Sequence, residues 1–239
     1  VRPFASGAVF AAGFASALGQ ILLLRELLVL FYGNELSTGI ILAAWLLWTA
    51  MGSCLGGCFS TSGHNRPLFL SIGLWIEAAL LPAAILFIRA SRLLWSIPVG
   101  EMFPFGIMLA ITFTATSLFC ATGGGVFALA WDLADADPDR ACGRPLGIYV
   151  GEALGSAVGG LTAHYLFVPH LDGWEAAFAV TSILALVGVL LLPRRPMTSL
   201  TLLGRLALMG AFVAAGWTAT PHLERFGYAS HRWNWGDLL

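Results

Sequence analysis

Five side chains that can ionise or form hydrogen bonds interrupt long apolar stretches of this sequence. They are Gln20, Arg25 and Glu26 in the first stretch, Glu77 in the third and Glu152 in the fifth. An ionisable group at membrane depth costs about 2.5–3.5 kcal/mol on insertion scales, so it is expected to face the protein interior and to have a partner. Charge pairing, proton binding and recognition of a small polar substrate are the kinds of chemistry that such residues support.

We expect Arg25 to pair with Glu152 or Glu77 across a helix bundle. Two interpretations of this pair stay open: it only fixes the register of the helices, or it forms a site for a polar substrate or a proton. Glu26 is adjacent to Arg25 in the sequence and is therefore expected to point elsewhere, towards the interface beside Asn34. Asn34 itself is a good N-cap for the helix that follows it.

The sequence predicts no catalytic residue, no metal site and no cofactor. It contains no serine nucleophile motif, phosphate loop or dinucleotide fingerprint. Arg140 stands where a calcium loop needs Gly, so a solvated acidic loop is expected at Asp132, Asp135, Asp137 and Asp139. His164 has no second histidine at membrane depth to complete a haem site. We expect buried free thiols at Cys54, Cys58, Cys120 and Cys142.

The elements that position these residues must lie in lipid. Hydrophobic residues make up 58% of the 239 residues and charged residues only 10%, which is too little charge to cover a soluble domain of this size. The lipid bilayer is therefore the expected partner. The net charge of −1 argues against a nucleic-acid partner, which would require a basic patch, so none is expected.

The apolar stretches predict an all-α integral membrane protein. A spanning helix needs about 20 mainly apolar residues. Seven stretches reach that length, at residues 8–32, 36–60, 67–90, 102–133, 145–168, 174–192 and 198–219. Residues 1–220 therefore form a transmembrane domain of seven helices, or of eight if the long fourth stretch crosses twice. Residues 221–239 form a polar, aromatic tail that is expected to lead into a further domain.

Glycines in the second, fourth and fifth stretches predict close helix packing. Gly147, Gly151, Gly155 and Gly159 recur every four residues and form a smooth helix face, while Gly52 and Gly56 make one such step. Small-xxx-small faces let helix backbones approach closely in lipid. The fifth-stretch face could pack inside the bundle or meet a substrate or another subunit. The triplet at residues 123–125 predicts close packing, a broken helix that lines a cavity, or two short crossings.

Several of these segments resemble the membrane domain of bacterial spermidine synthase-like proteins. The likeness rests on residues 20–26 (QILLLRE), 31–37 (FYGNELS) and 43–53 (AAWLLWTAMGS), and on the glycine-rich residues 147–160. The resemblance implies a major-facilitator-like membrane domain ahead of an aminopropyltransferase-like domain. It also implies a multi-pass protein of the bacterial inner membrane. The catalytic motifs of the transferase domain are absent from these residues, so no catalytic residue is carried over.

Three classes of function remain. The chain could be the membrane domain that anchors or serves such a transferase domain. It could be a transporter-like bundle for a small polar solute such as a polyamine, with a polar cavity around the five residues named first. It could also be a structural subunit of a larger complex, including a redox complex, held by other protein subunits. Arginines mildly favour an N-terminus in the cytoplasm.

Overall fold

The computed structural model describes residues 2–58, 66–98, 100–135 and 144–191, together with Gly210, Ala214 and Thr218. The described part is all-helical and contains no strand. Its helices are α1 (Arg2–Leu30), α2 (Glu35–Cys58), α3 (Arg66–Leu94), α4 (Phe105–Asp135), α5 (Arg144–Thr162), the π-helix η2 (Ala163–Phe167), α6 (Val168–His170) and α7 (Gly173–Leu191). The all-α fold expected from the sequence is therefore confirmed.

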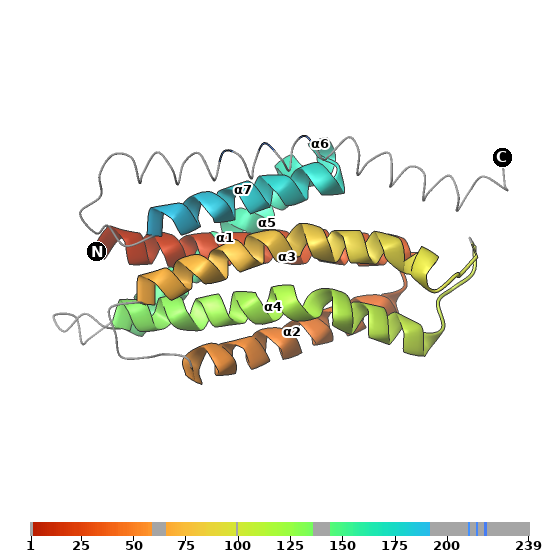
Figure 1. Cartoon of the computed structure of the whole chain (residues 1–239), viewed down its shortest axis with the longest axis horizontal. Helices are drawn as coiled ribbons and strands as arrows, with labels where there is room; N and C mark the ends of the chain where they lie inside the picture. Colours follow the sequence, from red (N-terminus) through yellow and green to blue (C-terminus); the bar gives the residue numbers. More distant parts are fainter. Residues whose placement is uncertain are drawn as a thin grey trace.

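The long helices run roughly along the long axis of the molecule and pack side by side (Figure 1). Helices α1, α3 and α4 form the centre, where α4 packs on both α1 and α3. Helix α2 packs mainly on α4, α5 on α1, and α7 on α3. Fully buried leucines from three helices build the core between these elements, among them Leu22, Leu74 and Leu184.

Five of the described helices are long and apolar enough to cross a membrane: α1, α2, α3, α4 and α7. Helices α1 to α4, with 24–31 residues, extend about 36–46 Å, which exceeds the roughly 30 Å of bilayer hydrocarbon, and α7, with 19 residues, extends about 28 Å. Helix α5, which contains Arg144, Glu152 and five glycines, is not among these five. The predicted seventh segment and the polar tail lie outside the described residues, apart from Gly210, Ala214 and Thr218, which are helical.

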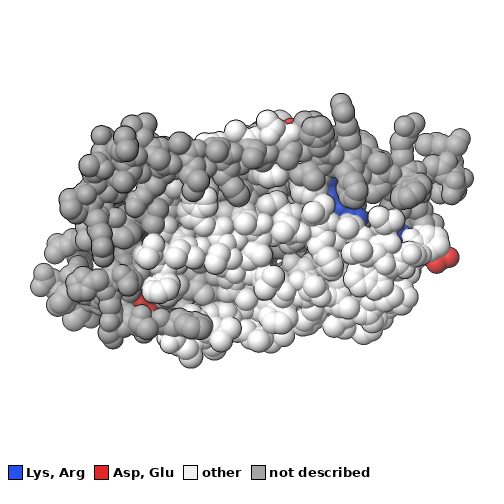
Figure 2. Space-filling model, in the orientation of Figure 1, with Lys and Arg blue, Asp and Glu red and all other residues white. Residues whose placement is uncertain are grey.

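The described outer surface carries few charges. On the face that Figure 2 shows, it is free of Lys, Arg, Asp and Glu over most of its length, and the larger coloured areas lie towards its ends. Leu46, Leu55, Leu118 and Leu161 are among the exposed large apolar side chains on this bundle. Cys54 and Cys58 are exposed on α2, so the expectation of buried thiols is wrong for them, whereas Cys120 is buried.

Helix α4 is continuous through its glycine triplet. Two short crossings in this segment, and the eighth helix that they would add, are therefore ruled out. The triplet lets two neighbours approach α4 on different sides. A Cβ atom at Gly124 would overlap the Thr49 carbonyl oxygen of α2, and one at Gly123 would lie 3.1 Å from the Glu77 carboxylate oxygen of α3. Close packing is thus the reason for these glycines.

The turn between α1 and α2 is defined by backbone and side-chain hydrogen bonds. Gly33 lies at φ +71°, and its N–H donates to the Leu28 carbonyl at 2.8 Å, which closes the end of α1. Asn34 then caps α2, because its Oδ1 accepts a hydrogen bond from the Leu36 N–H at 3.0 Å. The N-cap expected at Asn34 is present.

We expect Asn34→Ala to lower the free energy of unfolding by about 1 kcal/mol, because the Leu36 N–H loses its acceptor. Asn34→Asp keeps an acceptor oxygen and is expected to stay within a few tenths of a kcal/mol of the parent chain. SDS titration of the purified chain, followed by circular dichroism, measures both. Equal losses for the two variants would show that the cap does not stabilise α2.

Candidate functional site

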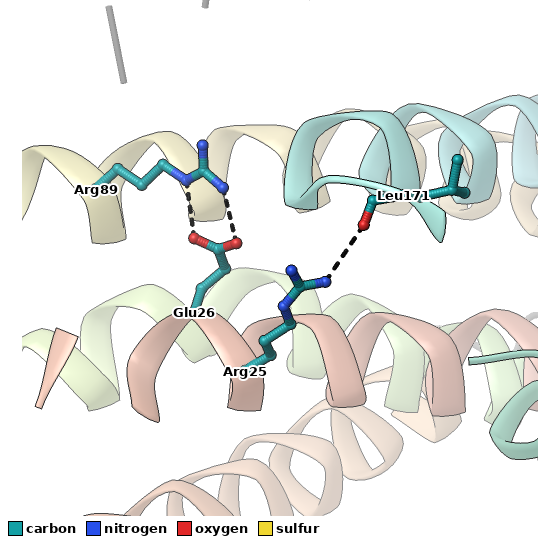
Figure 3. A network of polar contacts seen from close by, with 4 residues as sticks. All are labelled: Arg25, Glu26, Arg89 and Leu171. Atoms are coloured by element: carbon teal, nitrogen blue, oxygen red, sulfur yellow. Dashed lines mark hydrogen bonds and ion pairs between the residues drawn. The ribbon is translucent and has the colours of Figure 1, made fainter. Parts of the chain in front are cut away.

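An ion pair joins α1 to α3 near the end of both helices. Arg89 donates from Nε to Glu26 Oε2 at 2.8 Å and from Nη2 to Glu26 Oε1 at 2.9 Å (Figure 3). The two parallel bonds make a bidentate, charge-assisted pair, which is the strongest geometry for these groups. Only 10% of the Glu26 side chain and 23% of the Arg89 side chain are exposed. The pair therefore holds the two helices in one register.

The start of α7 covers this ion pair. The Arg89 guanidinium lies over the Trp174 ring, 5.0 Å from its centroid. A Cβ atom at Gly173 would overlap Glu26 Oε1, so a larger residue there would displace the Glu26 carboxylate from its place against the backbone of α7. Trp174 is 1% exposed and belongs to the core. Three helices therefore meet at one pair of opposite charges.

Arg25 does not make the pair that the sequence suggested. Its Nη1 lies 3.5 Å from the carbonyl oxygen of Leu171, just before α7 (Figure 3). Within the described chain, no ion pair links Arg25 to Glu77 or Glu152. Successive helical residues point about 100° apart, so only one of Arg25 and Glu26 can face α3. That residue is Glu26, which corrects the expectation that Glu26 points towards the Asn34 turn.

Arg92 is a buried arginine that the sequence interpretation did not select. It donates to the Leu30 carbonyl at 3.1 Å and to the Pro98 carbonyl at 3.0 Å. Its guanidinium also lies 4.9 Å from the Phe103 ring centroid. The sequence did hold a signal, because Arg92 continues the buried face of α3 at the 3–4 residue spacing of Leu81, Ile85 and Ile88. This arginine ties the ends of α1 and α3 together.

The other predicted polar residues lie elsewhere in the bundle. Gln20 is half-buried on α1, and Glu152 is half-buried on α5. Glu77 is 1% exposed on α3, and neither of its carboxylate oxygens has a hydrogen-bond partner in the described chain. No hydrogen bond or ion pair among the described residues joins Gln20, Glu77 or Glu152 to Arg25. The structure thus separates a paired charge cluster at one end from a solitary carboxyl group within the core.

The predicted glycine faces lie between paired helices, with one exception. Cβ atoms at Gly155 and Gly159 would lie against the backbone of Phe10 and Phe14 in α1, and Gly151 lies in ordinary contact with Val9. On α2, Cβ atoms at Gly52 and Gly56 would overlap the α4 backbone at Ala121 and Gly125. The exception is Gly147 on α5, where a Cβ atom would have no atom within 4 Å.

In this bundle, the charged side chains of Arg25, Glu26, Arg89 and Arg92 hold helix ends together through hydrogen bonds and one ion pair. The fold and the site define a class: an all-helical protein with five described helices long and apolar enough to cross a membrane. Among the described residues, no group of three His, Cys, Asp or Glu side chains is placed to hold a metal ion. No protein-family model, curated protein or solved structure matches the chain.

Proposed function

We propose that this chain is a multi-pass domain of the bacterial inner membrane, built as one half of a major-facilitator-like bundle. The helix pairing carries this proposal. Helices α1, α2 and α3 form one set of three, and α4, α5 and α7 form a second set. The described helices pack most extensively as α2 with α4, α1 with α5, and α3 with α7.

This pairing is preserved when the two sets are exchanged, with α1, α2 and α3 replaced by α4, α5 and α7. The α1–α5 pair then becomes the α4–α2 pair, and the α3–α4 pair becomes the α7–α1 pair. The α3–α7 and α1–α4 pairs map onto themselves. A set of three crossings is odd, so the second set enters the membrane from the opposite side. Such inverted repeats of three helices are the plan of each major-facilitator half.

Membrane integration is tested by extraction. We expect membranes from cells that express the chain to retain it during an alkaline carbonate wash and to release it in detergent, because α1 to α4 expose many large apolar side chains. A peripheral marker protein from the same membranes serves as the control and should be released by the wash. Release of the chain together with that marker would contradict integration.

Topology is tested with single cysteines. Cys58 is exposed at the end of α2, and Glu101 is exposed at the opposite end of the bundle, before α4. If the N-terminus is cytoplasmic, an impermeant maleimide labels a Glu101→Cys variant in intact spheroplasts, but labels Cys58 only after permeabilisation. The other cysteines are replaced by Ala in both variants. The reverse order of labelling would invert the proposed orientation.

We further propose that this membrane domain serves an aminopropyltransferase-like domain, as the resemblance to spermidine synthase-like proteins implies. Support comes from residues 20–26 and 31–37, which carry that resemblance. They supply Arg25, Glu26 and Asn34 to the polar end of the bundle. Membranes from cells that express the full gene product are expected to transfer an aminopropyl group to a diamine, unlike membranes with an empty vector. A gene product without this activity would contradict the proposal.

A transporter-like role for a small cationic solute such as a polyamine is the second candidate. The buried, unpartnered Glu77 carboxyl group favours it, because ionisable residues within membrane helices mark substrate and ion pathways and proton relays. Vesicles that contain the chain should then take up labelled polyamine, and Glu77→Gln should lose that uptake. Uptake at the rate of empty vesicles would exclude this candidate.

A further inference from the structure

Glu77 is the carboxyl group that the described structure isolates most completely. It lies near the middle of the α3 segment that could cross a membrane, Leu68–Leu94. The residue is 1% exposed, and neither carboxylate oxygen has a hydrogen-bond partner in the described chain. Its helical neighbours Leu74, Ala78 and Leu81 are fully buried apolar residues. Protein packing itself therefore excludes water from this group.

The facing surface of α4 offers Glu77 no cation. A Cβ atom at Gly123 would lie 3.1 Å from Glu77 Oε1, so the carboxyl group rests directly on the glycine backbone. One turn earlier on α4 is the buried Cys120. Two arginines flank Glu77 along α3: Arg66 lies eleven residues or about 17 Å before it, and Arg89 lies twelve residues or about 18 Å after it and is already paired with Glu26.

An ionised carboxylate in this position would be far too costly. Transfer of an isolated charge into an apolar interior is strongly unfavourable, and such a group is neutralised instead. A metal cation would need several oxygen ligands, and within the described residues no group of three acidic, His or Cys side chains supplies them. A proton needs no ligand besides the carboxyl oxygen.

We propose that Glu77 is a proton-binding site within the bundle, whose carboxyl group carries a proton in the resting protein. The α3 face supplies the acid, and Gly123 of α4 supplies the space that it occupies. The site depends on the packing of α3 against α4 and not on the proposed family or on an attached transferase domain. Its success or failure is therefore separable from that of the proposed function.

A hydrophobic carbodiimide tests this protonation state directly. The neutral acid transfers its proton to a carbodiimide nitrogen, and its oxygen bonds to the central carbon to give an O-acylisourea. The acyl group then migrates to nitrogen and forms a stable N-acylurea, so the whole reagent is retained and nothing leaves. A carboxylate anion without a proton source does not enter this reaction. Dicyclohexylcarbodiimide partitions into apolar regions and is the probe of choice.

We expect peptide mass spectrometry of the detergent-solubilised chain to find one added carbodiimide on the α3 peptide at Glu77. Glu26 is the internal control, because its carboxylate is held by Arg89 and should stay unlabelled. Glu152→Gln should leave the labelling unchanged, whereas Glu77→Gln should abolish it. Labelling of Glu26 or Glu152 in preference to Glu77 would overturn the proposal.

Infrared spectroscopy gives a readout that does not depend on reagent access. The difference spectrum between the parent chain and Glu77→Gln is expected to contain the C=O stretch of a neutral carboxylic acid, which shifts in D₂O. Carboxylate bands in that difference would show that Glu77 is ionised and would contradict the proposal. If Glu77→Gln fails to fold, the test is the carbodiimide labelling of the parent chain. An unmodified Glu77 in that experiment would contradict the proposed proton-binding site.

Discussion

Replacing Glu26 by Gln is expected to lower the free energy of unfolding by about 3 kcal/mol, because the change leaves the Arg89 guanidinium without its counter-charge. Both carboxylate oxygens of Glu26 are engaged, at 2.8 and 2.9 Å, and the Glu26 side chain is only 10% exposed. Water replaces the lost charge only in part, because no more than 23% of the Arg89 side chain is exposed. SDS titration of the purified chain, followed by circular dichroism, measures the loss.

Glu101→Gln is the matched control for this change, since Glu101 is exposed in the loop before α4. Its effect should stay within about 0.5 kcal/mol of zero, as for most surface substitutions. If Glu26→Gln and Glu101→Gln unfold at the same SDS concentration, the ion pair does not stabilise the bundle.

The double variant Glu26→Gln, Arg89→Gln separates pairing from packing. It leaves no uncompensated charge, so its loss should be smaller than the sum of the two single losses. Some loss should remain, because Arg89 also lies over the Trp174 ring. Strict additivity of the two single variants would mean that Glu26 and Arg89 act independently.

The existence of the first six helices could be predicted from the sequence, because the length of an apolar stretch is a local property that does not depend on the rest of the fold. Each of the first six predicted segments overlaps a helical run of the structure. The helix ends were less predictable: α3 continues to Leu94, four residues beyond its predicted end. That extension brings Arg92 into the helix and onto its buried face, where the sequence interpretation had assigned a loop.

The partners of the charged residues could not be predicted in the same way. Whether Arg25 or Glu26 faces α3 depends on the rotation of α1 about its axis and on which helix lies beside it. The rotation of α1 and the choice of its neighbour are set by packing among segments far apart in the chain. One example is the contact of Gly173, at the start of α7, with the Glu26 carboxylate. The sequence of a uniformly apolar helix does not show which face points towards which neighbour. The predicted helix is therefore present, whereas the predicted pairing of Arg25 with Glu152 or Glu77 is wrong.

The glycines that permit the α2–α4 contact give the second large effect. Gly52→Ala is expected to lower the free energy of unfolding by about 2–3 kcal/mol, through overpacking. The new Cβ atom would overlap the carbonyl oxygen of Ala121, which is backbone and cannot rotate away. Helix α2 must then withdraw from α4 and lose the hydrogen bond from Ser53 Oγ to the Gly124 carbonyl, now 3.2 Å. The same SDS titration measures the change.

Gly57→Ala provides the matched comparison on the same helix, because a Cβ atom at Gly57 would have nothing within 4 Å. It should raise stability slightly, by less than the roughly 0.5–1 kcal/mol that Ala gains over Gly in the middle of a helix, because Gly57 is one residue from the end of α2. The two variants add the same methyl group to α2, so a difference in sign isolates the contact with α4 from helix propensity. Because α2 packs mainly on α4, and helix association in lipid depends on close packing, a stabilising Gly52→Ala would mean that α2 does not lie against α4 as described.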